Sequence, residues 1–379
     1  MENLVQPATF IVLFLVSFLL CSLIVLVHPR LLRVLRARED LGSVQCAHLR
    51  STPRIGGVGV MAATLVGLLF LLPAHQTLSL PLFALTLVPV FLTGLAEDLG
   101  WRVSAAGRLL AAAISALLAV AILRVWLPPL EVPVLDVIMT VTPLAIAVTI
   151  LWATGVCHAF NLIDGVNGLA AGTAVAISAG IALVAHQAGA SGYAAVDAAM
   201  IPARLGFLVL NWPFGRVFLG DAGAYSVGHI LVWLAIGLAW VNSQVSALAL
   251  ALMFFWPVAD TFLAMARRMR SGKPVGAPDR LHYHQFVMRA MMLLSDGRLS
   301  KTAANSATTV VMLPLVTAPV ATAVYLWDRP LAAAMAWVGF GVLFTLSYLV
   351  GLRFFRSGRW KRVLRQFGPA IMPRGVRHS

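Results

Sequence analysis

The sequence predicts an all-α fold, a polytopic integral membrane protein with about eleven transmembrane helices. Of its 379 residues, 60% are hydrophobic and only 11% are charged, and the mean hydropathy is +0.90. A soluble domain of this size needs more charged residues to cover its surface, so the composition indicates that the bilayer is the solvent. Apolar runs of roughly 17–22 residues, the length that crosses about 30 Å of hydrocarbon, also recur along the chain. Residues 1–379 are therefore expected to form one multi-helix transmembrane domain.

The expected helices follow from these runs in chain order. The first begins at Ala8 with no basic segment before it and no small-residue cleavage site nearby, so it is interpreted as a helix and not as a signal peptide. The runs occupy residues 8–27, 56–73, 80–96, 107–125, 134–153, 169–187, 196–211, 222–241, 244–265, 308–326 and 331–351. The three cysteines, Cys21, Cys46 and Cys157, are far apart, so neither a disulfide framework nor a Cys metal site is expected.

The net charge of +14 indicates an orientation in the membrane. The basic residues cluster in 28–40, 267–280 and 353–366, which fall on one side if the chain starts outside and crosses eleven times. By the positive-inside rule the N-terminus is then outside, and the loop 266–306 and the basic tail 352–379 are cytoplasmic. The charge is assigned to topology and to contact with anionic membrane lipids, and no nucleic acid is expected as a partner.

The ionisable residues predict a site at the cytoplasmic face. Seven of the fourteen acidic residues fall at inner helix ends or in cytoplasmic loops, whereas the outer loops, including 188–197, carry little chemistry. Among the basic residues, Arg124, Arg329 and Arg204 are placed on or near the outer side. A transporter is expected to bury charges mid-helix and to repeat its halves, and neither feature is predicted here. The acidic residues so placed are Glu97, Asp98, Asp164, Asp221, Asp260, Asp279 and Asp296.

Two motifs open the predicted site. In "STPRIGGVGV", Gly56 and Gly57 at a helix entrance allow backbone N–H groups to approach either a phosphate or a neighbouring helix. In "GLAEDLGW", the adjacent carboxylates of Glu97 and Asp98 are costly at a membrane helix end unless they serve a cation or a proton transfer. A solvated turn is the alternative for this pair.

The stretch "HAFNLIDGVNGLAAG" interrupts two apolar runs with amides and a carboxylate. Asn161, Asp164 and Asn167 recur every three residues, so on a helical turn they would share one face. Such a stripe can ligate a hard metal, position a phosphate or recognise a base edge. Capping of the next helix by Asn161 or Asp164 is the simpler alternative.

Two later motifs complete the constellation. In "FLGDAG", Asp221 lies at a helix mouth, where Mg²⁺ could take one carboxylate oxygen and several phosphate oxygens; an N-cap would explain the Asp but not the flanking glycines. In "APDRLHYHQ", two histidines at i and i+2 suit a metal in some folds, but no third soft ligand is near. Binding of phosphate oxygens by Arg280, His282 and His284 is the better fit.

Carboxylates for Mg²⁺, cations for a pyrophosphate and amides for a nucleobase together indicate phosphoryl transfer from a soluble nucleotide to a lipid acceptor. The sequence here resembles the polyprenyl-phosphate N-acetylhexosamine-1-phosphate transferases (glycosyltransferase family 4-like), which include the phospho-muramoyl-pentapeptide transferases. The resemblance rests on "PRIGG", "EDLGW", "NLIDGVNGLAAG", "FLGDAG" and "PDRLHYHQ" in the family's order, clearest over residues 50–290. The helix count and the last motif resemble the sugar-nucleotide branch.

The resemblance implies transfer of an N-acetylamino-sugar-1-phosphate from a UDP-sugar to undecaprenyl phosphate at the bacterial inner membrane, with release of UMP. The product would initiate a surface glycan such as O-antigen or another cell-envelope polysaccharide. Asp221 matches the family's Mg²⁺ ligand, Mn²⁺ being the alternative metal, and Asp98 matches the carboxylate that orients or deprotonates the lipid phosphate. Asn161, a second metal ligand, and Asp164 match the Asn-x-x-Asp beside the diphosphate.

The remaining matches concern the nucleotide and the sugar. Asn167, Asn211 and Phe218 match uracil-contacting positions, and the Arg280, His282 and His284 loop matches the one that grips diphosphate and sugar. Glu97 departs from the family's first Asp, and Gln285 from its final His.

Several alternatives stay open. They are the muramoyl-pentapeptide branch, a membrane transporter without chemistry, the identity of the sugar, a homodimer, and a covalent phospho-Asp98 intermediate in place of direct displacement.

Overall fold

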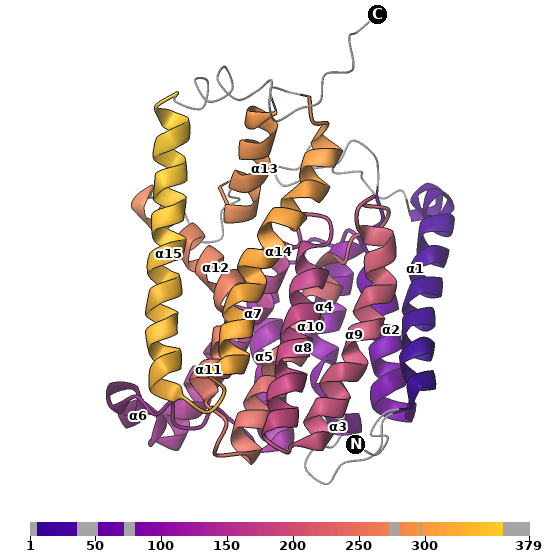
Figure 1. Ribbon diagram of the computed structural model, residues 1–379. Helices are drawn as coiled ribbons and strands as arrows, with labels where there is room; N and C mark the ends of the chain where they lie inside the picture. The colour runs from indigo at the N-terminus through magenta and orange to yellow at the C-terminus, as the bar shows by residue number, and fades with distance from the viewer. Residues whose placement is uncertain (1–5, 36–51, 72–79, 273–280, 296–297, 359–379) are drawn as a thin grey trace, which may run out of the picture.

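Long apolar helices run side by side through the computed structural model of this protein (Figure 1). The structure describes residues 6–35, 52–71, 80–272, 281–295 and 298–358, and within these ranges it contains helices and no strand, which confirms the all-α prediction. Cys46, Asp279, Arg280, Asp296 and the tail beyond residue 358 lie outside the described residues. Cys21 and Cys157 are free thiols, both buried, as expected.

The helical elements follow one another with short connections. In chain order they are α1 (Pro7–Leu35), α2 (Gly56–Val66), the π-helical turn η1 (Gly67–Leu71), α3 (Leu80–Thr86), α4 (Val88–Asp98), α5 (Ala105–Leu123), α6 (Pro133–Met139), α7 (Thr142–Ile163), α8 (Leu169–Gln187), α9 (Ser191–Asn211), α10 (Gly220–Val241), α11 (Ala247–Leu252), α12 (Phe255–Arg270), α13 (Tyr283–Leu294), α14 (Lys301–Tyr325) and α15 (Pro330–Arg356).

Among the described residues, eight helices are long and apolar enough to cross a membrane, and α3 with α4 makes a ninth candidate that is bent by 45°. These helices confirm a multi-pass membrane protein. The predicted runs 56–73 and 244–265 correspond to the shorter α2 with η1 and to the divided pair α11 and α12. The number of eleven crossings therefore stays a prediction.

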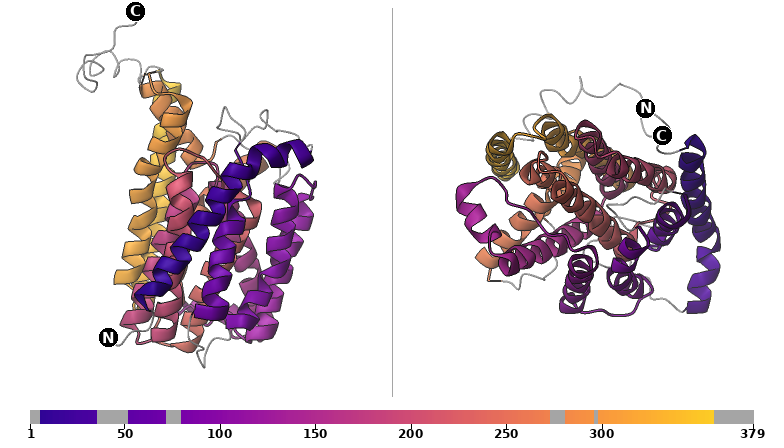
Figure 2. Two further views of the ribbon diagram at one scale, coloured as in Figure 1. Left: turned by 90° about the vertical axis from the view of Figure 1, so that its right-hand side faces the viewer. Right: turned by 90° about the horizontal axis from the view of Figure 1, so that it is seen from below.

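The helix α10 is the centre of the bundle. It is buried along nearly its whole length and packs against α4, α7 and α2. At two places the backbones meet through small residues: a Cβ added at Gly57 would collide with Gly223, and one added at Gly94 would lie 2.5 Å from the Cα of Ala222. By contrast, α1 and α15 lie at the periphery, where they expose apolar side chains as a lipid-facing surface does (Figure 2). The close packing fixes α2 and α4 relative to the start of α10.

Three predictions about the elements differ from the structure. The run 134–153 divides into the short α6 and the spanning α7, which continues to Ile163. The expectation that Asn161, Asp164 and Asn167 share one helical face is wrong, because α7 ends before Asp164 and Asn167 lies in the turn that leads to α8. The segment 266–306, expected as a long loop, contains α13 and the adjoining ends of α12 and α14.

The placement of Asp197 was also predicted wrongly. It was assigned to an outer loop, yet it lies with Arg204 inside α9, and the two residues have exposed fractions of 0% and 2%. The Arg204 Nη1 donates to the Ser178 hydroxyl on α8 at 2.9 Å. The expectation that no charge is buried within a membrane helix therefore fails at this position.

Candidate functional site

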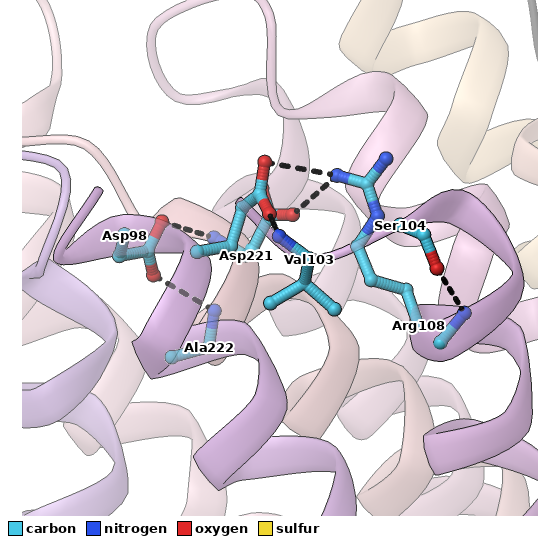
Figure 3. A network of polar contacts seen from close by, with 8 residues as sticks. Asp98, Val103, Ser104, Arg108, Asp221 and Ala222 are labelled. Carbon is cyan, nitrogen blue, oxygen red and sulfur yellow. Dashed lines mark hydrogen bonds and ion pairs between the residues drawn. The ribbon is translucent and has the colours of Figure 1, made fainter. Parts of the chain in front are cut away.

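The N-terminus of α10 is capped by two carboxylates from other segments of the chain. The two oxygens of Asp98, at the end of α4, accept the backbone N–H groups of Asp221 and Ala222 at 2.9 Å each (Figure 3). The Asp164 Oδ2, just after α7, accepts the N–H of Gly220 at 3.2 Å. The first N–H groups of a helix have no partner within it and carry a partial positive charge, so carboxylates are stabilised there. Three of the predicted site carboxylates thus meet at one point, and the solvated-turn alternative for Asp98 does not hold.

A second set of contacts joins Glu97 to Asp221 through Arg108. The Arg108 Nη1 lies 3.4 Å from the Glu97 Oε1 and 3.4 Å from the Asp221 Oδ2. Figure 3 shows the Arg108 guanidinium beside Asp221. The other Glu97 oxygen accepts the N–H of Val103 at 2.9 Å, which braces the turn between α4 and α5. Ser104 caps α5 and so sets the position of Arg108 one turn further on. The longer arm of Glu97 thus reaches both the turn and the guanidinium.

The glycines of the first motif serve backbone packing. Gly56 and Gly57 donate their N–H groups to the carbonyls of Phe218 and Leu219 at 2.9 and 2.8 Å. The N–H of Phe218 in turn donates to the carbonyl of Pro53. These two N–H groups are occupied by the loop before α10, so approach to a neighbouring helix, and not to a phosphate, is the interpretation that the structure supports.

Gly220 stands where no side chain fits. Its φ is +74°, and an added Cβ would collide with the carbonyl oxygen of Arg54 and lie 2.6 Å from the Asp98 Oδ2. Because Gly220 has no side chain, the "PRIGG" segment, the end of α4 and the start of α10 can lie in contact at this point. This explains why a glycine precedes Asp221.

The electrostatics of this cluster favour a bound cation. Glu97, Asp98, Asp164 and Asp221 face two cations, Arg54 and Arg108. Burial raises the pKa of Asp164 well above its usual range, and the charges of Asp98 and Asp221 raise it further, against the lowering effect of Arg54 and the Gly220 N–H. When all four carboxylates are ionised, they outnumber the two guanidinium groups by two, and a divalent cation would balance this excess of negative charge.

The carboxylate and amide oxygens of the cluster fit a Mg²⁺ ion that a bound substrate also ligates. No group of three His, Cys, Asp or Glu side chains within the described residues forms a metal cage. Mg²⁺ is usually held by one or two carboxylates together with substrate phosphates and water, and such a site needs no cage. Asp221 and Asn161, which is half-buried in the last turn of α7, are the residues that would hold it beside Asp164.

Asn167 and Asn211 hold the loops of the site together. The amide of Asn211 accepts the N–H of Gly168 at 2.5 Å and donates to the carbonyl of Val217 at 2.7 Å. The backbone N–H of Asn167 donates to the Asn305 Oδ1 of α14 at 2.8 Å, and its side-chain Nδ2 lies near the Pro213 carbonyl. Contact of Asn167, Asn211 and the half-buried Phe218 with a nucleobase stays a prediction.

The two histidines of the last motif lie at the start of α13: His282 directly precedes the helix, and His284 is its second residue. Their Nδ1 atoms each lie 3.4 Å from the Oδ2 of Asp260 on α12. The His284 Nε2 lies 3.4 Å from the position of a Cβ on Gly165, next to Asp164. The structure therefore brings His284 to the edge of the carboxylate cluster, while Arg280 lies outside the described residues.

Sequence reasoning missed Arg108 and the role of Asp260. Arg108 lies in an apolar helix and belongs to no quoted motif, but a lone arginine one turn after a helix N-cap was a usable signal. Asp260 was noticed only as one of several acidic residues at the inner face. Its contact with both histidines depends on how α12 and α13 pack, which no spacing rule gives.

Part of the chain matches a known family and several named proteins. Residues 79–239 match the model of glycosyl transferase family 4. The chain is 34% identical over 146 residues to a probable undecaprenyl-phosphate N-acetylglucosaminyl 1-phosphate transferase of Bacillus subtilis, covering 38% of this chain and 41% of that protein. It is 32% identical over 160 residues to the undecaprenyl-phosphate alpha-N-acetylglucosaminyl 1-phosphate transferase of Escherichia coli K12, covering 40% and 43%.

A third relative aligns with a longer part of the chain. The decaprenyl-phosphate N-acetylglucosaminephosphotransferase of Mycobacterium tuberculosis is 28% identical over 274 residues, covering 64% of this chain and 67% of that protein. The chain spans about two fifths of the length of the first two relatives. Asp98, Asp164 and Asp221 all fall within the matched residues 79–239. Over residues 79–239, the chain is similar to glycosyl transferase family 4, the family that its ordered motifs resemble.

Proposed function

We propose that this protein transfers an N-acetylamino-sugar-1-phosphate from a UDP-sugar to undecaprenyl or another polyprenyl phosphate, releasing UMP. The observation that carries the proposal is the convergence of Asp98, Asp164 and Asp221 on the N-terminus of α10, at one end of a membrane bundle. The relatives are named as transferases of N-acetylglucosamine 1-phosphate, so N-acetylglucosamine is the first donor to test. The product would initiate a surface glycan at the cytoplasmic face of a bacterial inner membrane.

The reaction is a displacement at phosphorus. A phosphate oxygen of the lipid attacks the β-phosphorus of the donor, a new P–O bond forms, and the bond to the oxygen of UMP breaks. Both reactants are anionic, so the site must neutralise charge and align them. Bound at Asp221 and Asn161, Mg²⁺ would supply positive charge to the donor diphosphate. Arg108 and the histidines would supply the remaining positive charge and hydrogen bonds.

The contacts of Asp98 favour direct displacement over a covalent phospho-enzyme. Both of its oxygens accept backbone N–H groups at the start of α10, so an attack by either oxygen would break a hydrogen bond that holds the helix. Asp98 is then an orienting residue, which keeps Asp221 in place. A protein incubated with donor labelled in the β-phosphate, but without lipid, is expected to retain no covalent label.

The function is tested by UMP release from purified protein in detergent with polyprenyl phosphate, Mg²⁺ and a panel of UDP-amino sugars. Release is expected to need lipid and metal, and Asp221→Ala is expected to abolish it. Asp328→Asn is the matched control, because Asp328 is an exposed carboxylate between α14 and α15 that lies outside the cluster. Folded protein that releases no UMP from any donor would contradict the proposal.

A further inference from the structure

Asp260 is a buried carboxylate that the proposed reaction does not use. It is 1% exposed, and its two oxygens have separate surroundings. The Oδ1 accepts the backbone N–H of Tyr283, the first residue of α13, at 2.8 Å. The Oδ2 lies 3.4 Å from the Nδ1 of His282 and 3.4 Å from the Nδ1 of His284. One carboxylate thus contacts the backbone and both imidazoles of the "HYH" sequence.

The local structure makes this arrangement rigid. His282 and His284 flank Tyr283, and their rings stack at 5.6 Å with an interplanar angle of 15°. The Tyr283 ring packs against Trp256 of α12 and Phe344 of α15, which also contact each other, and its hydroxyl donates to Ser347. Because Tyr283 is anchored on the other side, the two histidines are turned together toward Asp260.

The chemistry of the contact selects which ring nitrogen carries a proton. An ionised carboxylate only accepts hydrogen bonds, so an imidazole nitrogen that faces it is the protonated one. Nδ1 faces Asp260 in both rings, which leaves Nε2 on the other edge. Within the described residues all four ring nitrogens are buried and without a hydrogen-bond partner, but only the Nδ1 atoms lie 3.4 Å from the Asp260 Oδ2. The Nε2 of His284 lies beside Gly165. A buried imidazole nitrogen without a partner is available to a ligand.

We propose that Asp260 is a positioning residue, which holds His282 and His284 by Nδ1 so that their Nε2 atoms accept hydrogen bonds from the sugar hydroxyl groups of the donor beside Asp164. The assignment of the donor rests on the proposed function, whereas the ring orientation does not. The 3.4 Å contacts are long for hydrogen bonds, as is common where a site tightens on binding its substrate. A carboxylate that orients a histidine for another group is a recurring device in metal and hydrolase sites.

The ring orientation is tested by NMR of full-length protein in detergent, with ¹⁵N-labelled histidine. Long-range proton–nitrogen correlations report which nitrogen is protonated, and His282→Gln and His284→Gln assign the two signals. In the unmodified protein both rings are expected to carry a proton on Nδ1. A ring with an unprotonated Nδ1 and a protonated Nε2 would overturn the proposal. Because this measurement uses the unmodified protein, it does not depend on whether a variant at Asp260 folds.

The effect on catalysis is tested with Asp260→Asn, which keeps the shape of the side chain but offers an amide. The Nδ1 preference is expected to be lost, and kcat/KM for the UDP-sugar to fall about 10- to 100-fold, with the KM for the lipid phosphate unchanged. Thr261→Val is the matched control: it changes the neighbour of Asp260 on α12, whose hydroxyl donates to the Pro257 carbonyl, and leaves Asp260, Tyr283 and both histidines in place. Its histidine signals and kinetics are expected to stay as in the unmodified protein.

Two results would separate the possible failures. If Asp260→Asn leaves the histidine signals and kcat/KM as they are in a folded protein, Asp260 has no positioning role and the proposal is wrong. If the signals change as expected but the unmodified protein releases no UMP, the positioning role stands and the proposed function fails.

Discussion

Arg108 is the side chain that links the two halves of the carboxylate cluster. It is the only described residue whose guanidinium lies within ion-pair distance of both Glu97 and Asp221. Its position follows from the turn that Glu97 braces and from the Ser104 cap of α5. A fixed cation beside the proposed Mg²⁺ ligand both orients that ligand and adds positive charge where the phosphates would meet.

Arg108→Met is expected to lower kcat for UMP release by about 100-fold, because it removes a preorganised cation at the reacting phosphates. Arg108→Lys keeps the charge but loses the planar fork, so an intermediate rate is expected. The control is Arg102→Met, an exposed arginine in the turn before α5. Equal rates for the two Met variants would show that Arg108 neither orients Asp221 nor contributes to the reaction.

Asp164 is expected to make Mg²⁺ binding sensitive to pH. Its pKa is raised well above the usual range, mainly by burial, so the metal-free protein holds a proton there at pH values where an exposed Asp is ionised. A metal binds the ionised form, and its affinity therefore rises with pH until the raised pKa is passed. Below that pKa the expected slope is about tenfold per pH unit for one proton.

Calorimetric titration of the protein with Mg²⁺ at several pH values measures this slope, and buffers of different ionisation enthalpy count the protons released. Asp164→Asn is expected to bind more weakly and with a flat pH profile. A steep profile that survives in Asp164→Asn would assign the proton to another group.

At the scale of elements, the turn between α7 and α8 shows what the sequence can and cannot predict. The motif gave the site residues, but the three-residue spacing suggested a continuous helix. The Asp164–Gly165 and Asn167–Gly168 pairs are turn signals, and the φ of +81° at Gly168 shows that the chain turns there. Local chemistry therefore predicted the turn better than the spacing did, whereas the ties of Asn167 to α14 come from packing between distant segments.

The start of α10 depends on a glycine at position 220. Gly220→Ala is expected to lower both thermal stability and UMP release, because a Cβ there collides with Arg54 and crowds Asp98. Gly189→Ala is the matched control: Gly189 has a similar φ of +72°, but nothing lies within 4 Å of an added Cβ. The control is expected to cost only the left-handed backbone penalty, about 1–2 kcal/mol, and to keep its activity.

Thermal unfolding in detergent and UMP release, measured on both variants, separate the two effects. If Gly220→Ala behaves like Gly189→Ala, the backbone conformation alone matters and the contact with Arg54 and Asp98 does not position the site.

At the scale of the whole molecule, hydropathy and charge predicted a multi-pass helical membrane protein. A segment that crosses lipid must have apolar side chains, and its backbone N–H and C=O groups must be hydrogen-bonded within the protein, as they are in a helix. The same reasoning misplaced Asp197, because a carboxylate near the start of an apolar run is interpreted as part of the preceding loop. Residues 197 and 204 lie two turns apart on one face of α9, and each lowers the other's cost of burial by its opposite charge.

These two residues are expected to stabilise the bundle as a pair. Asp197→Asn or Arg204→Met alone leaves the other charge buried and uncompensated, and such losses typically cost about 3–5 kcal/mol. The double variant is expected to be more stable than the sum of the single effects predicts, since neither charge then remains. Ser178→Ala, which removes one hydrogen bond to Arg204, is expected to cost only about 1 kcal/mol. A double-mutant cycle from equilibrium unfolding in bicelles measures the coupling, and strictly additive effects would mean that the two charges are buried independently.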